Sequence, residues 1–120
     1  MRLTCLICLL PLIALLAQAP NKVREPGRLP SKVVLDNKKV RVSEITYAPG
    51  APRERHIRAT DQVIVFLDDC RYERLDSQTK EKTIRERKAG EVIWHDRGED
   101  APQLTNLGTK TYRTLLVELK

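Results

Sequence analysis

Short apolar segments that alternate with turn signals predict an all-β domain, either a sandwich or a barrel. The segments recur about every ten residues from Val33 to the C-terminus, a spacing typical of such folds. They are rich in β-branched residues, and most end at Gly, Pro, Asn or Asp, which favour turns. A chain of 120 residues has room for one such domain.

The N-terminal residues 1–19 have the layout of a secretory signal peptide. Arg2 precedes an apolar run over residues 3–16, and the triplet Ala-Gln-Ala follows at 17–19. The run is shorter than the roughly 18 residues of a membrane-spanning helix. We therefore expect cleavage, an extracytoplasmic (periplasmic or secreted) location and no membrane span afterwards. Pro20 would hinder a peptidase at this bond, so an uncleaved N-terminal anchor is the competing interpretation.

The residues after this leader predict a tether, at 20–32, and then one domain at 33–120. Residues 20–32 are polar and interrupted by proline and glycine, which favour irregular structure. Cys70 is the one cysteine outside the leader, so the domain is expected to fold without an internal disulfide. The net charge of +6 is mild and mixed in sign. This charge suits a small anionic ligand, and without interleaved aromatic residues we expect no nucleic-acid binding.

The strands can be placed in order along the domain. Residues 33–35 precede an Asp-Asn turn, and residues 40–47 alternate apolar and polar side chains before Pro-Gly. The run VIVFL at residues 63–67 predicts a buried strand whose inward-facing set begins at Gln62. Residues 111–119 (TYRTLLVEL) predict the last strand.

Two further segments need a choice between alternatives. Residues 71–88 contain Glu-Arg and Lys-Glu pairs at helical spacing, but their few apolar residues do not form one narrow face. We therefore expect a charged hairpin that turns at residues 76–79, with its charges facing water. In the segment EVIWH at residues 91–95, we expect Trp94 in the core.

The segment that begins at Gly50 resembles the first motif of the small single-domain cupins (RmlC-like jelly rolls), G-x5-H-x-H-x3-E-x6-G. The four signature positions after this glycine are occupied here by His56, Arg58, Gln62 and Asp69, and Asp69 stands at the closing glycine. Of these, His56 alone is a signature residue.

The second cupin motif, G-x5-P-x-G-x2-H-x3-N, is matched in spacing by its glycines, Gly90 and Gly98. Asp96 stands at the proline position and Ala101 at the histidine position, while Asn106 lies one residue beyond the expected asparagine. The resemblance implies a single-domain cupin-like jelly-roll β-barrel preceded by the signal peptide.

The resemblance also implies where a metal ion would lie, because metal-binding cupins hold one with three histidines and a glutamate. This chain keeps only His56 of those four. A divalent ion about 5 Å from the Arg58 guanidinium would be repelled by roughly 7 kcal/mol at an effective dielectric of about 20. We therefore expect a degenerate site with no metal and no other cofactor.

The remaining polar residues at the mouth of this barrel predict a ligand site. His56 and Arg58 are expected to point to the same side of a strand, and guanidinium groups suit carboxylates and phosphates. The predicted function is binding of a small anionic or hydroxylated molecule by His56, Arg58, Gln62, Tyr72 and Asp100. The alternative for Arg58 is a solvated rim residue paired with Asp61 or Asp100.

Two other functions stay open at this point. One is a cupin-type enzyme, an isomerase or dioxygenase, that uses His56 as a base or as a ligand of a rebuilt metal site with Asp61 and Asp100. The other is a structural or partner-docking module, such as a homodimer formed through edge strands. The residues favour a non-catalytic domain without deciding whether a reaction is catalysed.

Overall fold

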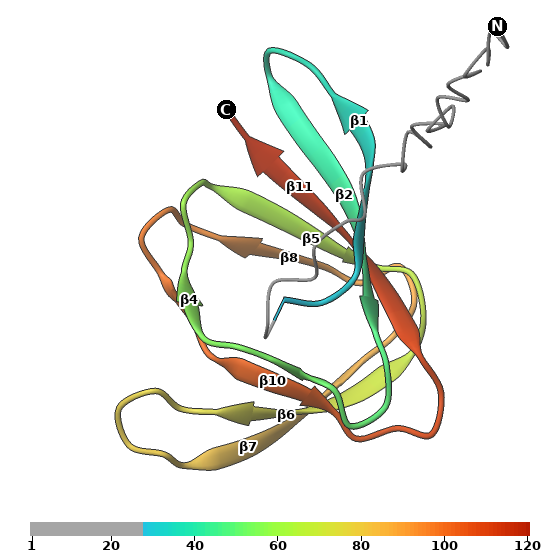
Figure 1. The fold of residues 1–120 in the computed structure, drawn as a ribbon, viewed down its shortest axis with the longest axis vertical. Coiled ribbons are helices and arrows are strands. Elements are labelled where there is room, and N and C mark those ends of the chain that lie inside the picture. The colour runs from blue at the N-terminus through green and yellow to red at the C-terminus, as the bar shows by residue number, and fades with distance from the viewer. Residues whose placement is uncertain (1–27) are drawn as a thin grey trace, which may run out of the picture.

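The computed structural model describes residues 28–120, which form three antiparallel sheets (Figure 1). A five-stranded sheet has the order β1-β2-β11-β5-β8, a four-stranded sheet has the order β3-β10-β6-β7, and β4 pairs with β9. The strands are β1 (Ser31–Asp36), β2 (Val40–Tyr47), β3 (Pro52–Arg53), β4 (His56–Ile57), β5 (Gln62–Phe66), β6 (Cys70–Leu75), β7 (Lys82–Arg87), β8 (Val92–His95), β9 (Asp100–Ala101), β10 (Gln103–Asn106) and β11 (Tyr112–Leu119).

The predicted all-β class is confirmed for the described residues, which contain strands and turns but no helix. The larger sheets face each other without joining into one hydrogen-bonded barrel. The predicted signal peptide at 1–19 lies outside the described residues, as does most of the predicted tether. No helix within residues 28–120 is long and apolar enough to cross a membrane.

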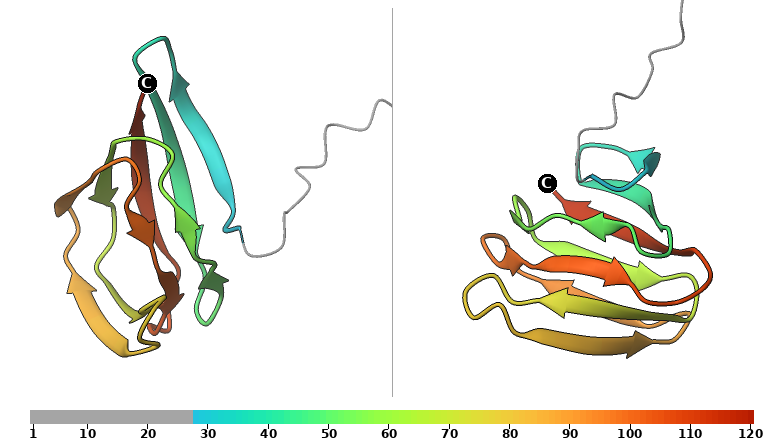
Figure 2. Two further views of the ribbon diagram at one scale, coloured as in Figure 1. Left: turned by 90° about the vertical axis from the view of Figure 1, so that its left-hand side faces the viewer. Right: turned by 60° about the horizontal axis from the view of Figure 1, so that its bottom comes forward.

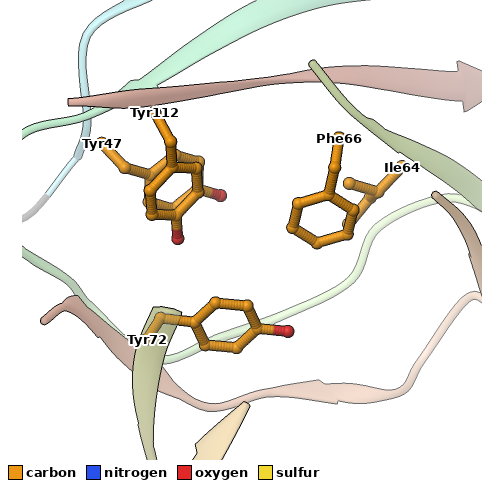
Figure 3. Packing of buried hydrophobic residues seen from close by; sticks show 5 residues of the cluster. All are labelled: Tyr47, Ile64, Phe66, Tyr72 and Tyr112. Atoms are coloured by element: carbon orange, nitrogen blue, oxygen red, sulfur yellow. The ribbon is translucent and has the colours of Figure 1, made fainter. Parts of the chain in front are cut away.

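The core lies between the two larger sheets (Figure 3). On β5, buried and half-buried residues alternate from Gln62 to Phe66, as the sequence predicted, so Phe66 faces inward. The rings of Tyr47 and Tyr112 stack with centroids 4.5 Å apart. Tyr72 reaches them from the opposite sheet, with its ring centroid 6.4 Å from those of Phe66 and Tyr112. The aromatic rings therefore hold the two sheets together.

The charged segment at residues 71–88 is the predicted hairpin and not a helix. β6 and β7 pair from Cys70 opposite Arg87 to Leu75 opposite Lys82. At the turn, the Asp76 carboxylate accepts hydrogen bonds from two backbone N–H groups. The prediction that the charges of this hairpin face water is wrong for three of its arginines, because Arg74, Arg85 and Arg87 line the space between the sheets.

Trp94 is not in the core, contrary to the sequence prediction. β8 is an edge strand whose inward-facing side chains are Ile93 and His95, so Trp94 lies on the outer face. Its side chain is 53% exposed, and its indole N–H donates a hydrogen bond to Asp96. A strand at a sheet edge with one covered face has no room inside for both sets of side chains.

The β1–β2 hairpin and the end of β11 project beyond the other strands (Figures 1 and 2). β1 is exposed along its whole length. It begins at Ser31, inside the stretch predicted as tether. The part of the five-stranded sheet next to β1 therefore has no four-stranded sheet opposite it and borders an open groove instead.

The short pair β4–β9 brings the two motif segments together. His56 lies opposite Ala101, and Ile57 lies opposite Asp100. The backbone N–H of Arg58 donates a hydrogen bond to the carbonyl of Glu99, so the pairing of the two segments continues for one more residue. The two segments that resemble the cupin motifs are therefore neighbours in space.

Candidate functional site

A cavity of about 200 Å³ lies between the two larger sheets. Aromatic side chains from both sheets line it, and they are Tyr47, Phe66 and Tyr112 from the five-stranded sheet and Tyr72 from the four-stranded sheet. Basic side chains also converge on it. The arginines among its lining residues are Arg53, Arg58, Arg74, Arg85 and Arg87.

The four-stranded sheet supplies most of these arginines through strand alternation. Tyr72 and Arg74 share the inner face of β6, and Arg85 lies directly opposite Tyr72 on β7. Arg53 on β3 lies opposite Leu104 on β10, which in turn lies opposite Arg74. The inner face of this sheet therefore carries guanidinium groups where a sheet that serves only as a core wall would carry apolar groups.

Arg58 is the most deeply buried of these arginines, with a relative exposure of 5%. Its Nη1 donates a hydrogen bond of 3.1 Å to Oε1 of Gln62, which is itself 4% exposed. Burial lowers the pKa of Arg58 from its ordinary value, and the positive charge of Arg53 adds to that effect. The Nε of Arg58 is buried and has no hydrogen-bond partner within the described chain. An unpaired donor on a buried cation is costly in free energy, and an anion would relieve that cost.

The other arginines differ in how they are compensated. Arg87 donates hydrogen bonds to the Tyr72 hydroxyl and the Glu91 carboxylate, and these two bonds raise its pKa. Arg53 donates from Nη2 to the Pro102 carbonyl, but its Nε is buried without a partner among residues 28–120. Within the same range, the side chains of Arg74 and Arg85 form no hydrogen bond or ion pair.

The two carboxylates that line the cavity are both bonded to other groups. Asp100 accepts hydrogen bonds from the Ser77 hydroxyl at 2.7 Å and from Arg55, and these bonds lower its pKa. Glu99 accepts from His95. Neither carboxylate forms an ion pair with the five cavity arginines in the described chain, so the cavity keeps an excess of positive charge.

His95 is a site residue that the sequence prediction missed. Its Nδ1 lies 2.9 Å from Oε2 of Glu99, and its side chain lines the cavity beside Gln62 on the neighbouring strand. Burial lowers the pKa of His95 below its ordinary value, and the charge of Arg58 acts in the same direction, whereas the hydrogen bond that His95 donates to Glu99 raises it. The spacing of His95 and Glu99 was visible in the sequence, but the side of the sheet that His95 faces was not.

The five predicted site residues are divided between two hollows. Arg58, Tyr72 and Asp100 line the cavity. His56 and Gln62 line a separate open groove of about 610 Å³, and Arg58 is part of that wall too. The structure therefore places Arg58 between the two hollows and does not bring His56 into the cavity.

His56 is exposed at the groove, and its Nδ1 lies 3.4 Å from the carbonyl oxygen of Glu54. Partial burial lowers its pKa, with a further contribution from the positive charge of Arg53. His56 and Arg58 both line the groove, but Arg58 is buried and reaches the cavity as well, whereas His56 is exposed.

The alternative that Arg58 is a solvated rim residue is wrong. Arg58 is buried and bonded to Gln62. Asp61, one of the two carboxylates considered as its partner, accepts a hydrogen bond from the backbone of Arg97. Asp100, the other, is bonded to Ser77 and Arg55.

The residues at the four family metal positions do not fit a metal ion. His56 and Ala101 face each other across β4 and β9, while Arg58 and Gln62 are bonded to one another. Alanine has no donor atom, and a guanidinium offers no lone pair and carries a positive charge. No group of three or more His, Cys, Asp or Glu side chains that could hold a metal comes together in residues 28–120.

The structure is similar to solved cupin structures. A cupin domain from Bordetella pertussis Tohama I matches with a TM-score of 0.69 and 18% identity, over 80% of this chain and 97% of that one. The polyketide cyclase RemF from Streptomyces resistomycificus matches with a TM-score of 0.65 and 23% identity, over 81% and 70%. An RmlC-like cupin from Methanocaldococcus jannaschii matches with a TM-score of 0.60 and 11% identity, over 80% and 84%.

These likenesses show that the fold is that of a small cupin, as the sequence resemblance implied. No family model matches the sequence. No curated protein matches it either.

Proposed function

With the cupin fold as the premise, we propose that this domain binds a small anionic or hydroxylated molecule without a metal ion, in the cavity between its sheets. The observation that carries the proposal is the buried cation Arg58. It stands at one of the positions that hold metal ligands in metal-binding cupins, and it is bonded to Gln62, which stands at another such position. In this arrangement a guanidinium group supplies the positive charge that a metal ion would otherwise supply. Carboxylate and phosphate oxygens are its best partners, because they accept from the planar set of N–H donors.

Titration calorimetry with phosphate, sugar acids and phosphosugars tests this proposal. Replacement of Arg58 by Met keeps much of the aliphatic volume and removes the charge. We expect Arg58→Met to weaken binding about tenfold to a hundredfold, the loss expected for a charge-assisted hydrogen bond. Arg71→Met is the matched control, because Arg71 lies on the exposed outer face of β6, and it should bind as the unmodified domain does. Absence of heat with every anion would contradict the proposal.

A second candidate function is catalysis by the pair His95 and Glu99. A histidine oriented by a carboxylate is a common arrangement for a general base, and this one lines the same cavity as Arg58. In this role Nε2 of His95 would take a proton from the ligand, and Arg58 would stabilise the resulting negative charge. RemF, one of the structural neighbours, is a cyclase. Exchange of ligand hydrogen for solvent deuterium, lost in His95→Gln but not in His56→Gln, would favour this candidate.

We also propose that the domain is exported, on the basis of the leader at residues 1–19. Mass spectrometry of the protein recovered from the cell envelope or the medium tests this. A mature N-terminus at Pro20 is expected, whereas an intact leader in the membrane fraction would favour the uncleaved anchor.

A further inference from the structure

The cavity and the groove share one wall. The residues that line both hollows are Tyr47, Arg53, Arg58, Ile64 and Thr114. The shared wall therefore presents two guanidinium groups to each hollow. A molecule that lies in the groove can place one end against Arg53 and Arg58 without entering the cavity completely.

The two arginines of this shared wall carry the unsatisfied donors of the site. The Nε atoms of Arg53 and Arg58 are both buried, and neither has a hydrogen-bond partner in the described chain. The positive charge of Arg53 also lowers the pKa of Arg58, so the two guanidinium groups oppose each other. One acidic group placed between them would accept hydrogen bonds and offset this repulsion.

The groove differs from the cavity in its lining. Apolar side chains from four segments of the chain meet along it, and they are Leu29, Val33, Ile45, Ile57 and Leu116. Val33 and Ile57 are each 52% exposed there. Charged residues also line it, including the carboxylates of Glu54 and Glu118. Its volume of about 610 Å³ falls in the range typical of small-molecule sites, which is about 300 to 1,000 Å³, whereas the cavity alone is smaller.

We propose that the ligand is an amphiphilic anion, whose acidic head lies between Arg53 and Arg58 and whose apolar chain lies along the groove. The inference rests on the proposed function and adds the class of the ligand to it. The acidic head of the ligand is assigned to the two arginines by charge complementarity, since their buried donors need an acceptor. The apolar chain of the ligand is assigned to the groove because exposed apolar side chains lie there and burial of apolar surface favours binding.

Titration with linear monocarboxylates of increasing length, from acetate to decanoate and below micelle-forming concentrations, tests the inference. Each methylene that enters the groove should tighten binding roughly fourfold. Val33→Ser and Ile57→Ser should reduce this dependence on chain length. Leu35→Ser is the matched control, because Leu35 is equally exposed on β1 but does not line the groove, and it should leave the dependence unchanged. Arg58→Met should weaken binding at every length.

The outcomes separate this inference from the function on which it rests. If short anions bind through Arg58 with an affinity that does not depend on chain length, the inference is overturned and the proposed function stands. If no anion of any length binds, the proposed function fails as well. If the unmodified domain is a dimer by size exclusion and Val33→Ser makes it a monomer with no chain-length dependence, a second copy covers the groove and the inference is overturned.

Discussion

The two sheets that face each other differ in what their inner faces carry. The inner face of the five-stranded sheet is mostly apolar and aromatic, with Tyr47, Ile64, Phe66 and Tyr112. The inner face of the four-stranded sheet carries one aromatic residue of that core, Tyr72, together with Arg53, Arg74, Arg85 and Arg87. One sheet therefore supplies most of the buried apolar surface, and the other supplies charge to the cavity. In a domain with a small core, apolar packing on one sheet can stabilise the fold while the other sheet carries charged groups whose burial is unfavourable.

The largest expected effect comes from removing a ring from the apolar sheet. Phe66→Ala should lower the free energy of unfolding by about 3 to 5 kcal/mol, because it leaves a cavity in the core. Urea denaturation followed by circular dichroism measures this loss. Arg85→Ala, on the opposite face, should change the free energy of unfolding by less than about 1 kcal/mol. Equal losses for the two variants would contradict the division between the sheets.

A smaller effect is expected from the charged sheet, and it should appear in binding. Arg74→Gln and Arg85→Gln should each weaken the affinity for phosphate by about tenfold, equivalent to about 1.4 kcal/mol. Neither variant should unfold more easily, since neither arginine has an ion pair to lose within residues 28–120. Calorimetry and denaturation on the same samples measure both quantities. Arg71→Gln, on the outer face of β6, is the control that should alter neither.

The pH dependence of binding gives a third test, with an expected change of a few-fold. Because burial holds the pKa of His95 below its ordinary value, the imidazole is neutral at pH 7 in the free domain. Protonation adds positive charge to the cavity, so the affinity for sulfate should rise as the pH falls through that pKa. His95→Gln should remove most of this rise. An affinity that falls with decreasing pH would be inconsistent with an anion site next to His95.

The lowered pKa of His95 has the opposite effect on stability: the affinity for anions should rise as the pH falls, whereas the free energy of unfolding should decrease. A histidine whose pKa is lower in the folded state than in the unfolded state binds protons more readily when unfolded. The free energy of unfolding without ligand should therefore fall as the pH drops from above the ordinary value of 6.5 through the lowered pKa of His95. Sulfate should oppose this fall in the unmodified domain.

The smallest effect is expected on the outer face of the apolar sheet. Trp94→Ser should change the free energy of unfolding by no more than about 0.5 kcal/mol, as is usual for surface substitutions, because Trp94 is 53% exposed on an edge strand. Trp94 is also the one tryptophan of the chain. Its fluorescence should have the long-wavelength maximum of an exposed indole and should not respond to ligand. A large loss of stability would show that this face is covered in solution.

The sequence predicted those features that depend on local pattern and spacing. The strand predicted at residues 63–67 is β5 (Gln62–Phe66), and its inward-facing set begins at Gln62 as expected, because alternation and β-branched residues are local signals. The hairpin at residues 71–88 was preferred over a helix because the apolar residues lacked a helical face, and the structure has that hairpin. The two motif segments were matched by spacing alone, and the structure pairs His56 with Ala101.

The parts that the sequence did not predict depend on which face of a strand is covered. In β7, one face carries Thr83, Arg85 and Arg87, and the other carries Lys82, Ile84 and Glu86. The single apolar residue, Ile84, is 51% exposed, so alternation does not tell the inside from the outside. In β8, Trp94 and His95 point to opposite sides, and the more apolar of the two is the one that faces out. The preference for burying tryptophan is a weak average, and the position of β8 at the sheet edge overrides it.

The sequence by itself determined the all-β architecture, the positions of the turns and the replacement of metal ligands by Arg58, Gln62 and Ala101. These follow from residue types and their order along the chain. Only the tertiary structure decided that Arg58 is buried against Gln62, that other arginines share its cavity and that His56 lies in the neighbouring groove. Their placement depends on which strands from distant parts of the chain lie face to face, and local sequence patterns do not specify such long-range contacts.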